Sequence, residues 1–83
     1  MELMAEMKNK LVKSKIVERY LAEEGLTLGQ LAKRCGIGLR NINKIANLDG
    51  TVGAFKVMAV AEVVGVGMQN FVDEFQKHDI MKT

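Results

Sequence analysis

The sequence contains no proline and no tryptophan, and only one tyrosine and three phenylalanines occur among its 83 residues. Aromatic residues make up 5% of the chain, whereas hydrophobic residues make up 48%. The strand and hairpin-turn patterns of a β-rich domain are missing as well. A chain of this length forms one domain, residues 1–83, and buries roughly 60 to 65% of its unfolded surface. The composition therefore favours an all-α domain with a small aliphatic core.

Cysteine and histidine are equally scarce. Cys35 is the only cysteine, which excludes an intramolecular disulfide and indicates a reducing, cytoplasmic setting. One cysteine and one histidine, His78, are too few for a zinc site. No nucleophile, base and orienting group recur at a recognisable spacing, and the glycines lack the pattern of a dinucleotide-binding loop. We therefore expect no enzyme, no metal and no cofactor, and we assign Cys35 to the core as a small apolar residue.

Long uninterrupted apolar runs are also missing. The first ten residues include two glutamates and contain no apolar stretch of signal-peptide length. The most apolar run, residues 52–68, is interrupted by Lys56 and Glu62 and is too short to cross a bilayer. The sequence accordingly predicts a cytoplasmic protein that does not bind membranes.

The spacing of the apolar residues predicts five helices, over about residues 9–24, 27–35, 38–47, 53–64 and 67–82. The second predicted helix has the clearest start, because Thr27 and Gln30 have the spacing of a reciprocal capping box. Gly25 is placed to end the helix before it, and Gly36 separates it from the helix that follows. Two short helices joined by a glycine-containing turn, residues 27–47, have the plan of a helix-turn-helix.

The third predicted helix, residues 38–47, has a strongly polar face. Ile42, Ile45 and Ala46 have the spacing of a buried stripe, and the opposite face carries Arg40, Asn43, Lys44 and Asn47. Arginine can bind guanine through two hydrogen bonds, asparagine can bind adenine in the same way, and lysine attracts phosphate. The plainer alternative is the solvated face of an ordinary bundle helix.

This part of the chain resembles the Cro and phage-repressor class of helix-turn-helix proteins, the xenobiotic-response-element regulators. The matching positions are Ala32, Gly36 at the turn, Ile37, Ile42 and Ile45. The resemblance runs from about residue 17 to residue 71 and includes the Gly-Val turn at residues 65–66. It implies a five-helix lambda-repressor-like domain in which residues 38–47 are the recognition helix. The candidate DNA-binding residues are Thr27, Leu28, Leu39, Arg40, Asn41, Asn43, Lys44 and Asn47.

Four positions depart from the family's pattern. Leucine occupies positions 28 and 39, where members of the family commonly carry glutamine or another polar residue. The two leucines either contact thymine methyl groups or pack on each other. Gly38 replaces the usual serine cap, at a cost of a few tenths of a kcal/mol. Asp49 lies in a loop that is usually basic.

The net charge of +2 is unevenly distributed. Residues 1–47 hold nine Lys and Arg against five acidic residues, and residues 48–83 hold three against five, so the two parts carry +4 and −2. The basic part includes the predicted helix-turn-helix. It also includes a cluster that is either a phosphate-contacting arm or the solvated face of the first helix, namely Lys8, Lys10, Lys13 and Lys15.

The last two predicted helices have more apolar residues than one core face accommodates. In residues 53–64 we assign four residues to the core and leave Phe55 and Val60 without a place; the four are Val57, Met58, Ala61 and Val64. In residues 67–82 we expect Phe71 to lie partly in the core and Phe75, Ile80 and Met81 to face outward. This surplus predicts a twofold dimer interface formed by Phe55, Phe75, Ile80 and Met81. The alternative is that the N-terminal segment covers these residues.

Together these patterns predict a homodimeric transcriptional regulator that binds double-stranded DNA, more specifically a repressor of an inverted-repeat operator. The competing hypothesis is a protein-interaction module on the same fold, such as an antitoxin-like or antirepressor partner with little DNA binding of its own.

Overall fold

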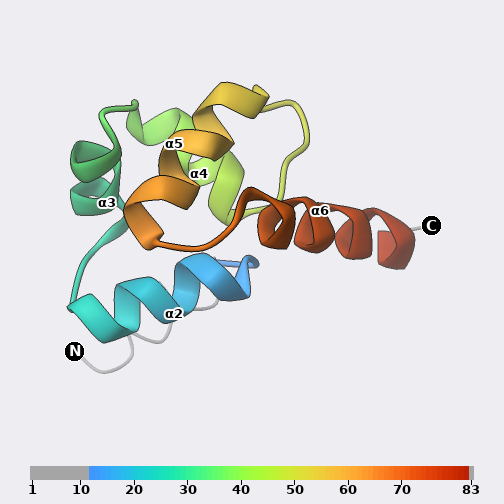
Figure 1. The fold of residues 1–83 in the computed structure, drawn as a ribbon, viewed down its shortest axis with the longest axis horizontal. Coiled ribbons are helices and arrows are strands. Elements are labelled where there is room, and N and C mark those ends of the chain that lie inside the picture. The colour runs from blue at the N-terminus through green and yellow to red at the C-terminus, as the bar shows by residue number, and fades with distance from the viewer. Residues whose placement is uncertain (1–11, 83) are drawn as a thin grey trace.

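The computed structural model describes the backbone of residues 12–82 and the side chains of residues 12–79. This part of the chain contains five α-helices and no strand, which confirms the predicted all-α class (Figure 1). The helices are α2 (Lys15–Glu24), α3 (Leu28–Cys35), α4 (Leu39–Ala46), α5 (Ala54–Val64) and α6 (Met68–Lys82). None of these helices combines the length and the apolarity that a bilayer-spanning helix requires.

The local signals that start and stop the helices are confirmed. The Gln30 N–H donates to Thr27 Oγ1 at 3.3 Å, and the Thr27 N–H donates to Gln30 Oε1 at 2.9 Å, which completes the capping box of α3. Gly25, Gly36 and Gly65 follow α2, α3 and α5 with φ between 65° and 83°. Glycine adopts this left-handed conformation without steric cost, so each of these helices ends where the sequence predicts.

The prediction of the first helix was wrong over residues 12–14. Residues 12–14 are not helical, and α2 begins at Lys15 with Ser14 as its N-cap. The Ser14 hydroxyl accepts a hydrogen bond from the Val17 N–H at 3.2 Å, which satisfies one of the free donors in the first turn of α2. Serine prefers this capping position to a helix interior. The spacing of apolar residues before Ser14 therefore did not predict the start of α2. The predicted start near residue 9 lies outside the described residues.

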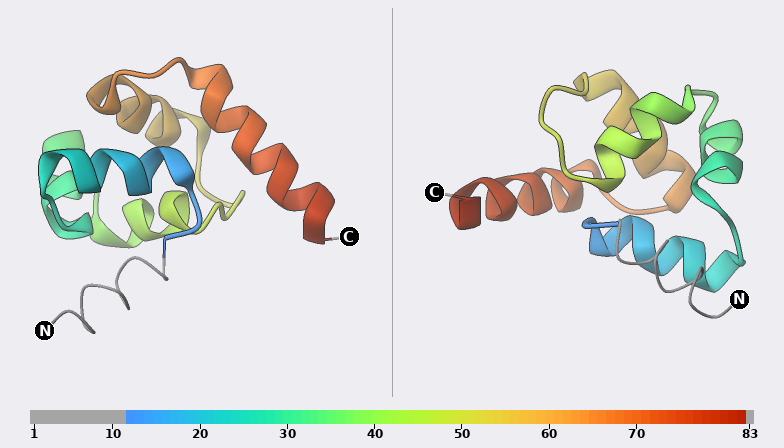
Figure 2. Two further views of the ribbon diagram at one scale, coloured as in Figure 1. Left: turned by 90° about the horizontal axis from the view of Figure 1, so that it is seen from below. Right: turned by 180° about the vertical axis from the view of Figure 1, so that it is seen from behind.

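The core lies where α3, α4 and α5 meet, with α2 and α6 closing it from the other side (Figures 1 and 2). Helix α3 packs against α4 and α5, and α5 packs against α6. The largest fully buried apolar side chains come from all five helices, and they are Phe71, Leu31, Ile42, Ile45, Val17 and Val60. The C-terminal half of α6 projects beyond the other helices in every view (Figure 2).

Three burial predictions for α5 and α6 were wrong or incomplete. Met58, which we assigned to the core, is 44% exposed, and Val60, which had no assigned place, is fully buried. Phe75 does not face outward but is half-buried against the core. Helix α5 is apolar on nearly every side, so several stripes satisfy the helical period equally well. The packing of α5 against α3 and α6 selects the stripe that includes Val57, Val60 and Ala61.

Candidate nucleic-acid interface

Helices α3 and α4 are joined by the three-residue turn 36–38 and pack closely against each other. The Gly36 N–H donates to the Lys33 carbonyl at 3.2 Å, and the Ile37 N–H donates to the Ala32 carbonyl at 3.1 Å. These bonds fix the direction in which the chain leaves α3. Ala32 is only 4% exposed, and its small side chain allows the close approach of helices that the turn requires.

Apart from Leu39 in its first turn, helix α4 separates its apolar residues from its polar residues. Ile42, Ile45 and Ala46 have no exposed surface, whereas Arg40 and Asn43 are exposed. Of the other predicted polar residues, Asn47 is exposed, and Asn41 and Lys44 are half-buried. The predicted orientation of this helix is therefore confirmed, and its solvent-facing side carries arginine, lysine and asparagine.

The key side chains of this face are available for a ligand. Within residues 12–79, the side chains of Arg40, Asn43 and Lys44 have no hydrogen-bond or ion-pair partner. Asn47 differs, because its Nδ2 donates to the Asn43 carbonyl at 2.9 Å, near the end of the helix. Asn47 therefore uses one donor to satisfy a backbone group, and only its remaining donor and its oxygen can face a ligand.

The candidates at the helix starts have different environments. Thr27 is exposed, but its hydroxyl takes part in the capping box of α3. Leu28 is half-buried and packs against the core, whereas Leu39, the first residue of α4, is 53% exposed. Leu28 thus stabilises the fold, and Leu39 presents an apolar surface beside Arg40. Gly38 is the N-cap of α4, as predicted, and provides no side-chain hydrogen bond there.

The charged residues around α4 do not all face the same way. Arg34 of α3 points toward α2, where its Nη1 donates to the Tyr20 hydroxyl at 3.0 Å and lies 3.4 Å from Glu24 Oε1. The hydrogen bond to Tyr20 raises the pKa of Arg34 above its ordinary value, and the hydrogen bond to Glu24 makes the next largest contribution. Asp49 accepts hydrogen bonds from the N–H and the hydroxyl of Thr51, at 2.9 and 2.8 Å. The Asp49 side chain therefore shapes its own loop.

The end of α4 has a feature that the sequence analysis missed. Leu48 has a φ of 58°, in the left-handed region, and is the only non-glycine residue of the described chain with a positive φ. Its N–H donates to the Ile45 carbonyl at 3.1 Å, and the Asp49 N–H donates to the Lys44 carbonyl at 2.8 Å. This is a Schellman ending with leucine in the usual glycine position, at a cost of about 1 to 2 kcal/mol. Burial of the Leu48 side chain, 7% exposed, offsets that cost.

Lys13 is also placed at this end of α4. The Lys13 N–H donates to the Ala46 carbonyl at 2.8 Å, and its side chain is exposed. The lysine cluster in the sequence was the signal for a basic segment here, but the sequence did not predict its contact with α4. Lys8 and Lys10, which belong to the same cluster, lie outside the described residues.

The residues predicted to form a dimer interface lie in different settings. Phe55, in the first turn of α5, is 85% exposed, whereas Phe75 is half-buried against the core. The side chains of Ile80 and Met81 lie outside the described residues.

One hollow of the described surface lies away from α4. It is an open groove of about 230 Å³ between α2 and the connection from α5 to α6, and no residue of α3 or α4 lines it. Its walls are formed by Lys15, Ile16, Arg19, Tyr20, Glu23, Val64 and Val66. Cys35 lies at the end of α3 and packs partly against the core, where burial raises the pKa of its thiol. A protonated thiol is a poor nucleophile, in keeping with the packing role expected for Cys35.

Comparison of the chain with protein-family models, with curated proteins and with solved structures found no match. The resemblance to the Cro and phage-repressor class therefore stays a prediction based on the residues quoted for it.

Proposed function

We propose that the protein is a helix-turn-helix transcriptional regulator that binds double-stranded DNA with the solvent-facing side of α4. The observation that supports this proposal best is the exposure of the polar side chains on that face. Helix α4 buries Ile42 and Ile45 completely, while Arg40 and Asn43 extend into solvent with no partner in the described protein. Because the hydrogen-bonding groups of these side chains have no partner in the described protein, they are available to bind the edges of base pairs.

The spacing of these residues suits a helix in the major groove. Arg40 and Asn43 are three residues apart, so they lie on the same side of α4, less than one turn from each other. Arginine recognises O6 and N7 of guanine, and asparagine recognises N6 and N7 of adenine. Lys44, next along the helix, provides a positive charge for a phosphate. Leu39 offers an apolar contact for a thymine methyl group.

The proposal extends to a homodimer that represses transcription. A single α4 offers few base contacts, so pairing two copies lengthens the site and raises affinity. A twofold pair would place the two α4 helices about 34 Å apart, on an inverted repeat with half-site centres about 10 base pairs apart. Phe55 is the best-exposed large apolar residue of the described surface and the first candidate for the interface. The proposed setting is cytoplasmic, with no metal or cofactor.

Salt dependence of duplex binding tests the proposal. Fluorescence anisotropy with a labelled duplex of mixed sequence should give an affinity that falls steeply as the salt concentration rises from 50 to 200 mM. Lys44→Ala should reduce the slope of log K against log salt by about 1, because one phosphate contact is lost. Lys77→Ala is the matched control, since Lys77 is an exposed lysine on α6 and should leave the slope unchanged.

A wild-type protein that fails to bind duplex DNA even at 50 mM salt would overturn the proposal. The second candidate function, a protein-interaction module, would then be preferred. It is supported by the exposed apolar side chains of Leu39, Phe55 and Met58, which are 53%, 85% and 44% exposed. Such residues on the surface of a small domain are typical of contacts with another protein.

Sedimentation tests the dimer separately. Wild-type protein at tens of micromolar should sediment as a dimer, and Phe55→Glu should sediment as a monomer with unchanged helical content. Phe75→Glu is a less clear test, because Phe75 packs against the core and a glutamate there destabilises the fold as well. A wild-type monomer at this concentration would contradict the homodimer.

A further inference from the structure

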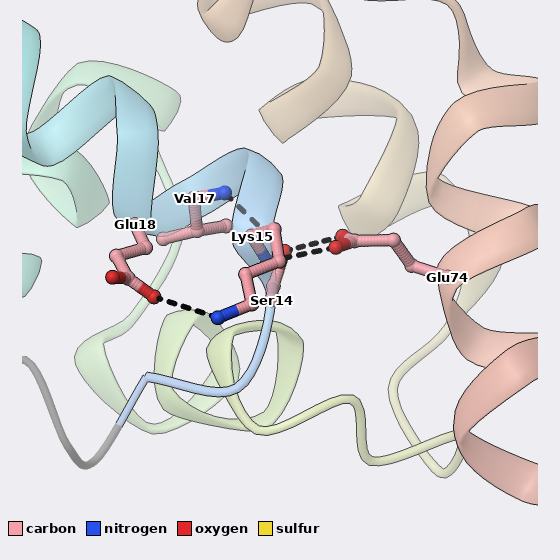
Figure 3. A network of polar contacts seen from close by, with 5 residues as sticks. All are labelled: Ser14, Lys15, Val17, Glu18 and Glu74. Atoms are coloured by element: carbon pink, nitrogen blue, oxygen red, sulfur yellow. Dashed lines mark hydrogen bonds and ion pairs between the residues drawn. The ribbon is translucent and has the colours of Figure 1, made fainter. Parts of the chain in front are cut away.

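A partly buried hydrogen-bond network joins the start of α2 to the middle of α6 (Figure 3). Ser14 has no exposed surface and is the only buried polar residue of the described chain. Its hydroxyl donates to Glu74 Oε1 at 2.6 Å, while the other carboxylate oxygen accepts from the Lys15 N–H at 2.7 Å. A single carboxylate on α6 therefore accepts two hydrogen bonds from the first residues of α2, 60 and 59 positions away in the chain.

The same short segment also holds the end of α4. The N–H groups of Lys13 and Ser14 both donate to the Ala46 carbonyl, each at 2.8 Å. Ala46 is the last residue of α4. Ser14 therefore contacts α6 through its side chain and α4 through its backbone. The three helices α2, α4 and α6 meet at this residue.

The chemistry of the network makes the Glu74 contact stronger than an ordinary surface hydrogen bond. Hydrogen bonds to an ionised carboxylate are roughly twice as strong as neutral ones. The carboxylate also lies at the N-terminus of α2, where the helix dipole favours a negative charge. Removing it leaves the buried Ser14 hydroxyl without an acceptor, and an unsatisfied buried hydroxyl is costly.

The network lies where α6 leaves the body of the protein. Phe71, one turn before Glu74, is fully buried, and Phe75, the residue after it, packs against the core. Beyond Phe75, residues 76, 77 and 79 are exposed, and the helix projects past its neighbours (Figure 2). Glu74 is thus the last charged side chain on α6 that is fixed to another helix within the described residues.

We propose that Glu74 is a positioning residue that couples the docking of α6 to the C-terminal end of α4 through residues 13 and 14. A contact that tilts or lifts the projecting half of α6 weakens the hydrogen bonds of Glu74. The segment 13–14 is then less firmly held, and the backbone bonds to Ala46 loosen with it. The coupling between the three helices does not depend on DNA binding.

Amide hydrogen exchange, followed residue by residue by NMR, tests this coupling. Glu74→Ala should speed exchange at Lys13, Ser14 and Lys15 roughly 2- to 30-fold relative to the amides of Ile42 and Ile45 within α4. Glu74→Gln keeps the size and one acceptor oxygen, so it should restore part of the protection. Asp79→Ala is the matched control, since Asp79 is an exposed carboxylate on the same helix without a partner in the described residues.

The pattern of exchange separates coupling from simple destabilisation. A merely structural role for Glu74 predicts the same relative increase at every slowly exchanging amide, including those of Ile42 and Ile45. That uniform result, or unchanged exchange at Lys13 and Ser14, would overturn the proposal. If Glu74→Ala does not fold, Ser14→Gly replaces it, because glycine caps a helix almost as well but cannot reach Glu74. It should then loosen the Lys13 amide selectively.

A second measurement asks whether the coupling reaches the proposed DNA-binding face, and this part rests on the proposed function. Glu74→Ala should weaken duplex binding roughly 2- to 30-fold, while Asp79→Ala leaves it unchanged. If the wild type binds no duplex, the proposed function fails, and the exchange experiment still decides the coupling. Selective loosening at Lys13 with unchanged duplex affinity would show that the coupling stops short of that face and would overturn this part.

Discussion

Helices α4 and α5 are neighbours in sequence and differ in how they use their apolar residues. Both begin after a glycine that provides no side-chain cap, Gly38 for α4 and Gly53 for α5. Apart from the exposed Leu39 in its first turn, helix α4 divides into a fully buried apolar side and a polar side. Helix α5 is apolar on nearly every side and leaves Phe55 and Met58 exposed. When the apolar residues of a helix lie on one side, the sequence alone determines which side is buried. When a helix is apolar on nearly every side, its packing against neighbouring helices determines which side is buried.

The difference separates two kinds of surface on one small domain. After Leu39, the outward side of α4 carries mainly groups that form directional hydrogen bonds. The exposed part of α5 includes an aromatic and a thioether side chain, Phe55 and Met58, which associate with other molecules through burial. We interpret the first as a surface for DNA and the second as a surface for a protein, with a second copy of the chain as the proposed partner.

The largest expected effect comes from comparing two phenylalanines. Phe71→Ala should lower the free energy of unfolding by about 3 to 5 kcal/mol, because the side chain is fully buried. Phe55→Ala should change it by less than about 0.5 kcal/mol, because the side chain is 85% exposed. Urea unfolding, at concentrations where the protein is monomeric, measures both. Equal losses at the two positions would contradict the division between core and surface in α5 and α6.

The second comparison lies within α4. Ile42→Ala should lower the stability by about 2 to 5 kcal/mol through lost burial and a residual cavity. Leu39→Ala, at a 53% exposed position, should change it by less than about 0.5 kcal/mol. Thermal unfolding followed by circular dichroism gives both values. An Ile42→Ala variant that melts like the wild type would mean that the buried side of α4 is assigned incorrectly.

The third comparison concerns how the two helices end. The left-handed residue after α5 is Gly65, whose φ of 83° causes no strain in glycine, whereas the left-handed residue after α4 is Leu48, with a φ of 58°. Leu48→Gly should therefore be more stable than Leu48→Ala by about 1 kcal/mol, because alanine keeps the left-handed strain. At an ordinary helical position, Ala22, the order should reverse, with Ala22→Gly losing about 1 kcal/mol. The same ranking at both positions would exclude the left-handed conformation of Leu48.

The smallest expected effect concerns Cys35 at the end of α3. Burial raises the pKa of its thiol in the folded protein, so the folded state keeps the proton to a higher pH than the unfolded state. The contribution of Cys35 to the free energy of unfolding is fully present below the thiol's pKa in the unfolded state. It declines as the pH rises through the thiol's pKa in the folded state. Alkylation at pH 8 should be slower in the folded protein than in urea. Equal alkylation rates would place Cys35 outside the packed corner of α3 and α4.

The sequence predicted what local rules control. The capping box at Thr27, the glycine ends of α2, α3 and α5, and the buried stripe of α4 all follow from short-range patterns, and all are confirmed. The features that were missed depend on contacts between distant segments. At the start of α2, Ser14 binds Glu74, which is 60 residues away in the chain. At the end of α4, leucine is not a residue type that predicts a left-handed conformation, yet Leu48 adopts one. For the candidate site, the exposed face of α4 could be predicted from the spacing of its residues, whereas the environments of Leu28 and Arg34 could not.

Selection of binding sites from a library of random duplexes tests the central claim most directly, because it asks whether α4 reads base sequence. Wild-type protein should enrich a defined motif, arranged as an inverted repeat with half-site centres about 10 base pairs apart. The Arg40→Ala and Asn43→Ala variants should each lose about 1 to 3 kcal/mol on that motif and relax the preference at particular base pairs. An unenriched library, or the same motif and affinity with both residues replaced, would contradict the assignment of α4 as the recognition helix.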